Sequence, residues 1–405
     1  MESADILLQN FPAARRALRV AMVTETYPPE INGVAMTMGR IVEGLQARGH
    51  AVQLVRPRQN AREQPASAPL FEEILKQGLP IPRYDSLKFG LPAKKALVRL
   101  WAAQRPDIVH VVTEGPLGWS ALAAATKLRI PVATDFHTNY QSHSERYGIG
   151  WLKKPIAAYL RKFHNKAQRT FVPTRTMQEE LSHLGLRNLQ VVARGVDTQL
   201  FNPARRSTVL RRSWGAGNND IVVMYVGRLA AEKNLPVVLR AYMMMRIAQP
   251  SAKLVLVGDG PERAQLEREF PQAIFAGMRV REHLAAHYAS ADMFLFPSIT
   301  ETYGNVTVEA MASGLAVVAY DYAAAKQHIR HKINGLTVPF GATDDFVKLA
   351  TGLAADPSRI RAMGAAARAT AEKLDWRCTV AEFENALLEL TADQPRALYP
   401  INALA

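Results

Sequence analysis

The chain has a single cysteine, Cys378, among its 405 residues. One cysteine can form no disulfide within the chain and cannot supply a metal site made only of cysteines. No apolar run approaches the roughly 20 residues that a membrane-spanning helix needs. The first five residues contain two acids and no Lys or Arg, unlike a secretory signal peptide. We therefore expect a protein of a reducing compartment, in the cytoplasm.

Low-complexity segments and short repeats are also lacking, and the overall composition is ordinary. Hydrophobic residues make up 48% of the chain and charged residues 21%, which is close to average globular usage. This composition excludes a disordered, collagen-like or coiled-coil chain. A chain of 405 residues exceeds the size at which one hydrophobic core usually stops growing, so we expect two domains.

The charge is unevenly distributed along the chain. The formal net charge is +14. Residues 1–205 contain 28 basic and 16 acidic side chains, whereas residues 206–405 contain 22 and 20. A basic half favours an anionic partner, which could be a membrane surface, a phosphorylated ligand or a nucleic acid. The alternative is a basic surface that only keeps the protein soluble.

Apolar strand-like runs alternate with amphipathic segments along nearly the whole chain. This alternation is typical of parallel sheets covered by helices. Strands are expected in two series, at 18–23, 51–55, 108–112, 132–135 and 170–172, and then at 221–226, 254–257, 274–275, 293–296 and 316–319. We predict an α/β fold with an N-terminal domain (1–200), a second domain (206–375) and a final helix (376–405) that returns to the first domain.

The loops that follow the strands of the second series carry groups suited to a diphosphate. In open parallel sheets, ligands bind at the carboxyl ends of the strands. Arg228 and Lys233 follow the strand at 221–226, and Gly227 allows the backbone to approach a ligand closely. Two cations there could stabilise the negative charge of a departing diphosphate. The alternative is a surface loop with a Glu232–Lys233 charge pair.

The loop after the strand at 293–296 adds an expected helix start and two carboxylates. Gly304 leads into Asn305, Val306 and Thr307, whose backbone N–H groups would form an anion site at the helix N-terminus. Glu301 precedes this helix, and Glu309 lies about one turn inside it. Carboxylates accept hydrogen bonds from sugar or ribose hydroxyls. Many helix starts carry Glu, however, so the pair alone is weakly informative.

Two loops of the N-terminal half complete the expected cleft. Gly33 opens the first helix, close to where a ligand phosphate would lie, and His137 follows the strand at 132–135. A lone histidine is more often structural than catalytic, and its position at a strand end only partly offsets this.

Together these segments resemble family 4 of the retaining, nucleotide-sugar-dependent glycosyltransferases, and the resemblance covers nearly the whole chain. It is carried by four motifs in order, Arg194-Gly-Val-Asp197, Gly227-Arg228 with Glu232-Lys233, Val257-Gly-Asp-Gly-Pro261, and Glu301 to Glu309 with seven residues between them. The resemblance implies the GT-B architecture, in which two Rossmann-like domains enclose an interdomain cleft.

The resemblance also implies roles for the residues at the expected cleft. The donor would be a nucleotide sugar, bound as substrate without a further cofactor, and the chain lacks the Asp-x-Asp pair of metal-dependent relatives. His137 and Glu301 would act at the transferred sugar. Among the other donor-binding residues, Gly33, Arg228 and Lys233 would contact the diphosphate. The helix start would contribute Asn305, Val306 and Thr307, and Glu309 would contact the ribose.

The chain departs from the family pattern at two places: Tyr303 stands where the family usually has Phe, and residues 321–328 stand where many members have a Gly-rich turn followed by Glu. Three other local features connect the chain with the branch of the family that glycosylates lipids. The loop after His137, Arg194-Gly195 and the run of alanines at 323–325 are most similar to GDP-mannose-dependent mannosyltransferases and sulfoquinovosyl-diacylglycerol synthases. This similarity implies a hexose from GDP-mannose or a UDP-sugar and a glycolipid or diacylglycerol acceptor.

Residues 146–175 contain eight Lys or Arg and no Asp or Glu, interleaved with apolar and aromatic residues. As a helix, this segment would be amphipathic and cationic, and could lie on the anionic inner face of a membrane. The alternative is an ordinary helix packed on its domain with a solvated basic side.

Two other function classes stay open at this point. A nucleotide-sugar epimerase or a phosphorylase could use the same architecture, although no pyridoxal-type lysine motif is present. A nucleic-acid-binding protein would explain the positive charge, but no helix-turn-helix, RNP or zinc motif occurs in the sequence. We therefore expect no nucleic-acid partner.

Overall fold

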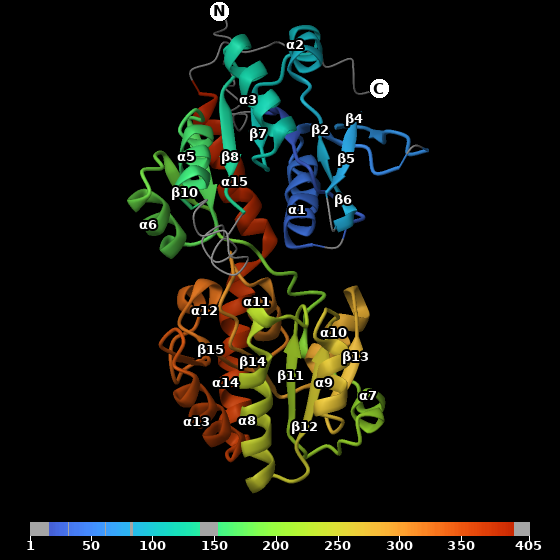
Figure 1. Cartoon of the computed structure of the whole chain (residues 1–405), viewed down its shortest axis with the longest axis vertical. Coiled ribbons are helices and arrows are strands. Elements are labelled where there is room, and N and C mark those ends of the chain that lie inside the picture. The colour runs from blue at the N-terminus through green and yellow to red at the C-terminus, as the bar shows by residue number, and fades with distance from the viewer. Residues whose placement is uncertain (1–15, 31, 61, 82–83, 138–152, 393–405) are drawn as a thin grey trace, which may run out of the picture.

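The computed structural model describes residues 16–30, 32–60, 62–81, 84–137 and 153–392. Figure 1 shows two lobes, one above the other, each built around its own sheet. We call the part built around the first sheet the N-terminal lobe and the part built around the second sheet the C-terminal lobe.

The N-terminal lobe has an eight-stranded sheet in the order β10-β9-β8-β7-β1-β2-β4-β3. Every pairing is parallel except that of β3 with β4. The strands are β1 (Arg19–Val23), β2 (Ala51–Pro57), β3 (Ser67–Ala68), β4 (Phe71–Lys76), β7 (Ile108–Val111), β8 (Val132–Asp135), β9 (Arg169–Val172) and β10 (Leu189–Val191). A separate antiparallel pair is formed by β5 (Gly78–Ile81) and β6 (Tyr84–Gly90).

Two groups of helices cover the two faces of this sheet. The helices of the lobe are α1 (Gly33–Ala47), α2 (Lys94–Ala103), α3 (Pro116–Leu128), α5 (Lys153–His164) and α6 (Arg175–His183). Asn32 caps α1 by accepting hydrogen bonds from the N–H groups of Val34 and Ala35, and Gly49, with φ of +87°, follows its last turn. α2 and α3 pack on one face of the sheet, and α1 packs on the other face.

The C-terminal lobe has a six-stranded parallel sheet in the order β13-β12-β11-β14-β15-β16. This is the 3-2-1-4-5-6 order of Rossmann-type sheets, which bind ligands where the strand order reverses. The strands are β11 (Val222–Val226), β12 (Lys253–Val257), β13 (Ile274–Gly277), β14 (Met293–Phe296), β15 (Ala316–Tyr320) and β16 (Leu336–Val338). β11, β14 and β15 are buried along their whole length, as expected of strands covered on both faces.

Helices surround the second sheet on both faces. They are α7 (Thr208–Ser213), α8 (Leu235–Ala248), α9 (Arg263–Glu269), α10 (Arg281–Ser290), α11 (Asn305–Ala312), α12 (Ala323–His328), α13 (Thr343–Ala354) and α14 (Pro357–Ala371). Short 3₁₀ turns lie at η2 (Pro203–Arg205), η3 (Ala231–Lys233) and η4 (Glu372–Leu374). Buried side chains of this lobe form one continuous core cluster around the sheet.

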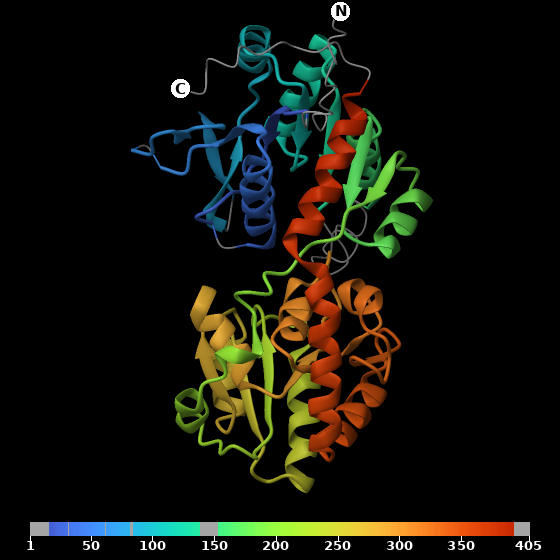
Figure 2. The same ribbon diagram turned by 180° about the vertical axis from the view of Figure 1, so that it is seen from behind.

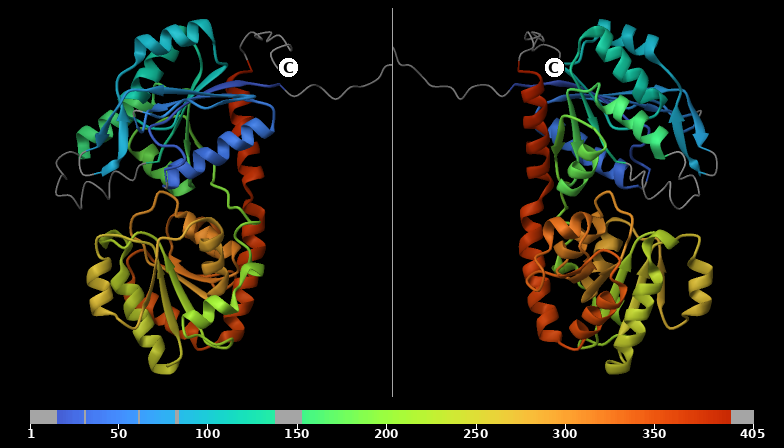
Figure 3. Two further views of the ribbon diagram at one scale, coloured as in Figure 1. Left: turned by 90° about the vertical axis from the view of Figure 1, so that its right-hand side faces the viewer. Right: turned by 60° about the vertical axis from the view of Figure 1, so that its left-hand side comes forward.

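The last helix, α15 (Trp376–Leu390), lies against the N-terminal lobe. Its Val380, Phe383 and Leu387 belong to the same core cluster as Val20 of β1 and Ile41 of α1. Figure 2 shows α14 and α15 running one after the other along the back of both lobes, and Figure 3 shows the same path from the side.

Within the described residues, the chain crosses between the lobes twice, at neighbouring places. Val196 forms a parallel bridge with Asp375, and its N–H donates to the carbonyl of Leu374 at 2.8 Å. A Cβ at Gly195 would lie only 2.7 Å from the backbone of Trp376, so the two crossing segments pack without room for a side chain at this point.

The predicted α/β class is confirmed, and each expected strand corresponds to an observed one whose ends differ by at most two residues. β3 to β6, β10 and β16 were not predicted from the sequence. They lie at or next to a sheet edge or form the separate antiparallel pair, and they lack the continuous apolar runs of the central strands.

Candidate active site

A cavity of about 710 Å³ lies between the lobes, where the carboxyl ends of strands from both sheets meet. The N-terminal lobe contributes Glu25, Thr26, Glu30, Asn32, Gly33, Val34, Lys88 and His137 to its lining, and Arg194 comes from the first crossing segment. The C-terminal lobe contributes Glu301, Thr302, Tyr303, Gly304 and Asn305. Four residues that the sequence predicted, Gly33, His137, Glu301 and Asn305, thus line one cavity.

Lys233 and Glu301 meet at the C-terminal side of this cavity. Lys233 ends η3, and its ammonium group forms an ion pair with Oε1 of Glu301, which also accepts a hydrogen bond from Ser298 Oγ at 2.7 Å. Their side chains are 16% and 15% exposed. The charges are therefore largely desolvated, and the loops after β11 and β14 bring a cation and a carboxylate together, as their positions at strand ends predicted.

The start of α11 faces the same cavity. Gly304 precedes the helix with φ of +87°, and no side chain caps it. Asn305 Oδ1 is buried and lacks a hydrogen-bond partner among the described residues, and a Cβ on Gly33 would lie 3.8 Å from Asn305 Nδ2. Uncapped N–H groups at a helix start attract anions. The two helix starts, α1 and α11, therefore approach each other across the cleft.

Val306, Thr307 and Glu309 continue α11 away from the main cavity. Thr307 is buried, and its N–H donates to the carbonyl of Gly304 at 3.0 Å. Glu309 accepts a hydrogen bond from Tyr288 Oη at 3.0 Å. Burial raises the pKa of the Glu309 carboxyl to about 7, and the hydrogen bond from Tyr288 partly opposes this shift. The contact of Glu309 with a ribose stays a prediction.

Arg228 is the most exposed of the predicted donor-binding side chains. Its side chain is 49% exposed and lies 3.7 Å from Glu232, so the charge pair weighed as an alternative involves Arg228 in this structure. Gly227 has φ of +152°, and a Cβ on Gly258 would lie 2.0 Å from the Gly227 carbonyl oxygen. The glycines of these two turns therefore let the ends of β11 and β12 pack backbone against backbone.

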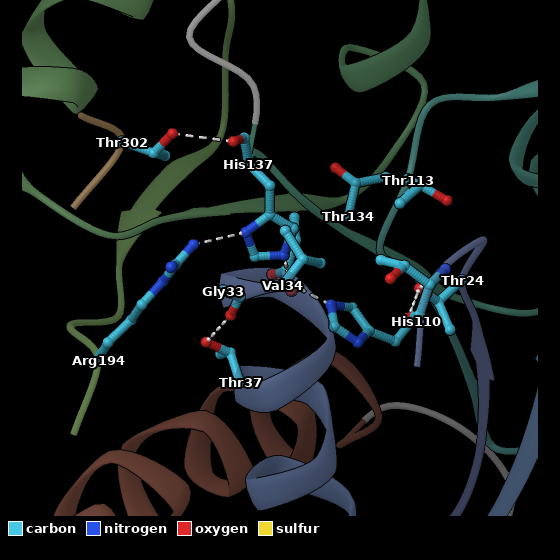
Figure 4. A network of polar contacts seen from close by, with 12 residues as sticks. Thr24, Gly33, Val34, Thr37, His110, Thr113, Thr134, His137, Arg194 and Thr302 are labelled. Carbon is cyan, nitrogen blue, oxygen red and sulfur yellow. Dashed lines mark hydrogen bonds and ion pairs between the residues drawn. The ribbon is translucent and has the colours of Figure 1, made fainter. Parts of the chain in front are cut away.

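His137 lies in a polar network that begins on the N-terminal sheet (Figure 4). Its Nε2 is 3.1 Å from Asp135 Oδ2, and its Nδ1 is 2.9 Å from an Arg194 guanidinium nitrogen. Because a guanidinium can only donate, Nδ1 accepts, and the ring proton lies on Nε2, facing Asp135. Both ring nitrogens of His137 are thus already used.

The other partners of the network hold His137 from both lobes. Thr302 Oγ1 donates to the His137 carbonyl at 2.9 Å, across the cleft. His110 Nε2 lies 3.1 Å from Asp135 Oδ1, at ion-pair distance. Burial alone would raise the pKa of Asp135, but the imidazoles of His110 and His137 reverse this and hold it well below its usual range.

Arg194 links this network to the C-terminal lobe. It is 8% exposed, and burial lowers its pKa although Asp135 opposes that shift. Its carbonyl accepts a hydrogen bond from Tyr303 Oη at 2.9 Å, and its guanidinium lies 5.9 Å from the centre of the Tyr303 ring. From the sequence, Arg194 was predicted only as part of a motif, because its partners His137 and Tyr303 lie 57 and 109 positions away in the chain.

No helix among the described residues is long and apolar enough to cross a bilayer. In the same part of the chain, no three His, Cys, Asp or Glu side chains gather as they would to hold a metal ion. The predicted cationic segment is partly described. Residues 146–152 lie outside the described residues, whereas α5 packs through Leu160 and Phe163 and exposes Lys154, Arg161 and Lys162.

Known protein families match both halves of the chain. Glycosyltransferase Family 4 matches residues 31–200, and Glycosyl transferases group 1 matches residues 220–356. A GDP-mannose-dependent alpha-mannosyltransferase of Corynebacterium glutamicum is 33% identical over 367 residues, covering 90% of this chain and 87% of the relative. The chain belongs to glycosyltransferase family 4. The resemblance to this family that the four sequence motifs indicated is thereby confirmed.

Further relatives of this family 4 glycosyltransferase include an alpha-monoglucosyldiacylglycerol synthase of Acholeplasma laidlawii, which is 27% identical and covers 75% of this chain and 81% of the relative. A sulfoquinovosyl transferase of Arabidopsis thaliana is 31% identical, covering 91% of this chain and 72% of the relative. Among solved structures, the sucrose-phosphate synthase of Thermosynechococcus elongatus has a TM-score of 0.74 at 20% identity, covering 93% of this chain and 99% of that one. HepE of Anabaena, in complex with UDP and glucose, has a TM-score of 0.70 at 17% identity, with 91% and 99% covered. The GT-B fold is thereby confirmed.

Proposed function

We propose that this glycosyltransferase moves a hexose from a nucleotide sugar to a hydroxyl of a glycolipid or diacylglycerol, with retention of the anomeric configuration. The donor would be GDP-mannose or a UDP-sugar. The name of the relative from Corynebacterium supports a sugar nucleotide as donor, and the name of the relative from Acholeplasma supports a diacylglycerol-based lipid as acceptor. The observation that carries the proposal is the Lys233–Glu301 ion pair in a cleft that the uncapped start of α11 also faces.

These groups suit the charge that develops when the sugar leaves the diphosphate. As the bond to the anomeric carbon breaks, negative charge grows on the leaving phosphate oxygen, and fixed donors and cations stabilise it. Lys233, Arg228 and the first N–H groups of α11 would supply this stabilisation. Lys233 is paired with Glu301 before the donor binds, so a phosphate would compete for the same cation.

The remaining predicted residues would hold the donor from its other sides. Gly33 leaves room for the phosphates, Glu301 would accept hydrogen bonds from sugar hydroxyls, and Glu309 would contact the ribose. Because Asp135 and Arg194 occupy both ring nitrogens of His137, we propose that this imidazole shapes the sugar pocket without transferring a proton. The acceptor proton would pass to the leaving phosphate oxygen.

A panel of nucleotide-sugar donors provides the direct test of this function. Purified full-length protein would be incubated with GDP-mannose, UDP-glucose, UDP-galactose and ADP-glucose in the presence of dioleoylglycerol vesicles. We expect one donor to raise the melting temperature most and to yield a glycolipid with the donor's anomeric configuration by NMR. Conversion of the donor to a second sugar nucleotide without acceptor would instead indicate an epimerase.

We propose that the reaction needs no metal ion, because Lys233, Arg228 and the α11 start would take the place of one as electrophile. Transfer rates should be equal in EDTA and in added Mg²⁺ or Mn²⁺. A rate that falls at least tenfold in EDTA and recovers on adding back the metal would contradict this proposal.

The exposed basic side of α5 leads us to propose a cytoplasmic protein that binds anionic membrane surfaces peripherally. Lys154, Arg161, Lys162 and Lys166 are exposed, while Leu160 and Phe163 pack inward. In a flotation assay at low salt, the protein should float with vesicles that contain anionic lipid. With vesicles of neutral lipid it should remain at the bottom of the gradient. A Lys154/Arg161/Lys162 to Gln triple variant should lose this binding, and Arg359→Gln on α14 serves as the control.

A further inference from the structure

Four polar side chains form the part of the cavity that the N-terminal lobe closes on the side of β1 and β6. They are Glu25, Thr26, Glu30 and Lys88, and we call them the polar corner. The donor-binding residues proposed above leave this corner without a role. An acceptor must enter the same cavity to reach the sugar, so the corner is the part of the lining available to it.

Glu25 is held in place by the backbone around it. Its N–H donates to Thr113 Oγ1 at 3.1 Å, and the Gly90 N–H approaches its Oε1 at 3.4 Å. The N–H of Leu117, in the first turn of α3, also donates to the carboxyl group. A Cβ on Gly115 would lie 2.1 Å from Oε1, so the carboxyl can occupy this position only because residue 115 is glycine.

The other members of the polar corner have their hydrogen-bonding groups engaged within the lobe. Glu30 accepts hydrogen bonds from Thr26 Oγ1 and from Gln59 Nε2, each at 2.5 Å. Lys88 Nζ donates to the Gln59 carbonyl at 2.5 Å. In contrast, no Lys, Arg or His of the described chain forms an ion pair with Glu25, and its backbone donors leave lone pairs for further hydrogen bonds.

We infer that Glu25 binds the acceptor, its carboxylate accepting a hydrogen bond from a hydroxyl of a neutral sugar or glycerol head group. This inference rests on the proposed function. Two carboxyl groups in the corner, Glu25 and Glu30, disfavour a phosphate-bearing head group. Val34 is the one aliphatic side chain in the described lining, so we expect the cavity to bind the polar head group of the acceptor and to leave its acyl chains outside.

The ionisation of Glu25 gives this role a pH dependence. Burial raises the pKa of Glu25 to about 7, its backbone hydrogen bonds oppose the shift, and Glu114 adds to it. The other titratable groups around it are Tyr159, which also interacts with it, and Glu30 and Lys88 in the corner. Because only the ionised carboxylate accepts with both oxygens, acceptor binding should strengthen as the pH rises through about 7.

The test compares wild type with Glu25→Gln in the full chain, using dioleoylglycerol vesicles, octyl glucoside and phosphatidylinositol as acceptors. The glutamine keeps one oxygen for the backbone donors. We expect the KM for the neutral acceptors to rise at least tenfold and its pH dependence near pH 7 to disappear. Hydrolysis of the donor by water and the KM for the donor should stay unchanged. Glu43→Gln on α1, whose side chain is 68% exposed, should match wild type throughout.

The outcomes separate this inference from the proposed function. An unchanged acceptor KM in Glu25→Gln, or an equal loss of donor hydrolysis, overturns the inference while an active wild type upholds the function. A clear preference for phosphatidylinositol also overturns it. A wild type that transfers to no hydroxyl acceptor overturns the proposed function and the inference together. If Glu25→Gln does not fold, Glu25→Asp, which keeps the charge but shortens the reach, should show the same rise in acceptor KM.

Discussion

The two lobes share an architecture but place polar groups in different parts of it. In the C-terminal lobe, β11, β14 and β15 bury apolar and tyrosine side chains, and the polar site groups lie on the loops beyond them. In the N-terminal lobe, β7 and β8 themselves carry His110, Thr134 and Asp135 in buried positions. The central strands of the C-terminal sheet are thus apolar, whereas strands of the N-terminal sheet contain a charged network that extends to the cleft.

The lobes also position their loops by different means. Around Gly227 and Gly258, close backbone packing sets the geometry, and there is no room for a Cβ. Around His137, hydrogen bonds and ion pairs set it. The turns at Gly227 and Gly258 should therefore be sensitive to side-chain size, and the network around His137 to charge and pH.

Lys233→Ala and Glu301→Ala should each lower the transfer rate about 100- to 1000-fold, because each removes one member of the cleft ion pair from the transition state. Steady-state kinetics would measure the loss, and melting curves would show that the fold is intact. Arg240→Ala breaks a surface ion pair with Asp344, in which the Arg240 side chain is 56% exposed. This control variant should keep the wild-type rate. Wild-type rates in both cleft variants would contradict the assigned roles.

Gly258→Ala should lower the free energy of unfolding by about 3 kcal/mol, since the new Cβ meets the Gly227 carbonyl and the residue has a φ of +136°. Urea denaturation would measure the change. Gly352→Ala on α13, where no atom lies within 4 Å of the new Cβ, should be neutral or slightly stabilising. Equal changes in the two variants would remove the argument from backbone packing.

Asp135→Asn should cost about 2 kcal/mol at pH 7, because the asparagine loses the charge that His110 and His137 stabilise. The folded pKa of Asp135 lies below its unfolded value. Its contribution is therefore complete above about pH 5, begins to be lost as the pH falls below about 4, and disappears only near the much lower folded pKa. Stability curves of wild type and variant should converge there. Asp344→Asn, at a side chain 84% exposed, should show no such convergence.

Tyr303→Phe should cost about 1 kcal/mol, the usual net value of a buried hydrogen bond. The hydroxyl donates to the Arg194 carbonyl and lies 2.9 Å from His328 Nε2. Burial lowers the pKa of His328 to about 4, so its imidazole is neutral at pH 7 and its N–H can donate to the tyrosine. Thermal unfolding would measure the loss, and a melting temperature equal to wild type would mean that the phenyl ring alone joins the lobes.

The sequence predicted well what depends on local pattern. Fully buried parallel strands appear as continuous apolar runs, so the central strands of both sheets were found, and strand ends then located Lys233, Glu301 and Asn305 near one cleft. The antiparallel pair of β5 and β6 was not found, because its side chains do not form such a run.

Long-range partnerships could not be read from the chain. Arg194 and His137 are 57 residues apart, and Arg194 and Tyr303 are 109 apart. Neither pairing has a local signal, and the role of Glu25 depends on a missing Cβ at Gly115, 90 positions further along the chain. The hydrogen bond between Glu309 on α11 and Tyr288 on α10 likewise depends on the tertiary structure, which the seven-residue spacing does not specify.

The position of α15 has a consequence for how the protein is made. The sheet that is synthesised first is covered on one face by α1 and by α15, which follows the whole second lobe in the sequence. While the ribosome is still translating the second lobe, Val20 and its neighbours lack the cover of Phe383 and Leu387. A nascent chain stopped before residue 376 should consequently expose an apolar face to chaperones, and a recombinant fragment of the first lobe alone should aggregate unless α15 is supplied as a peptide.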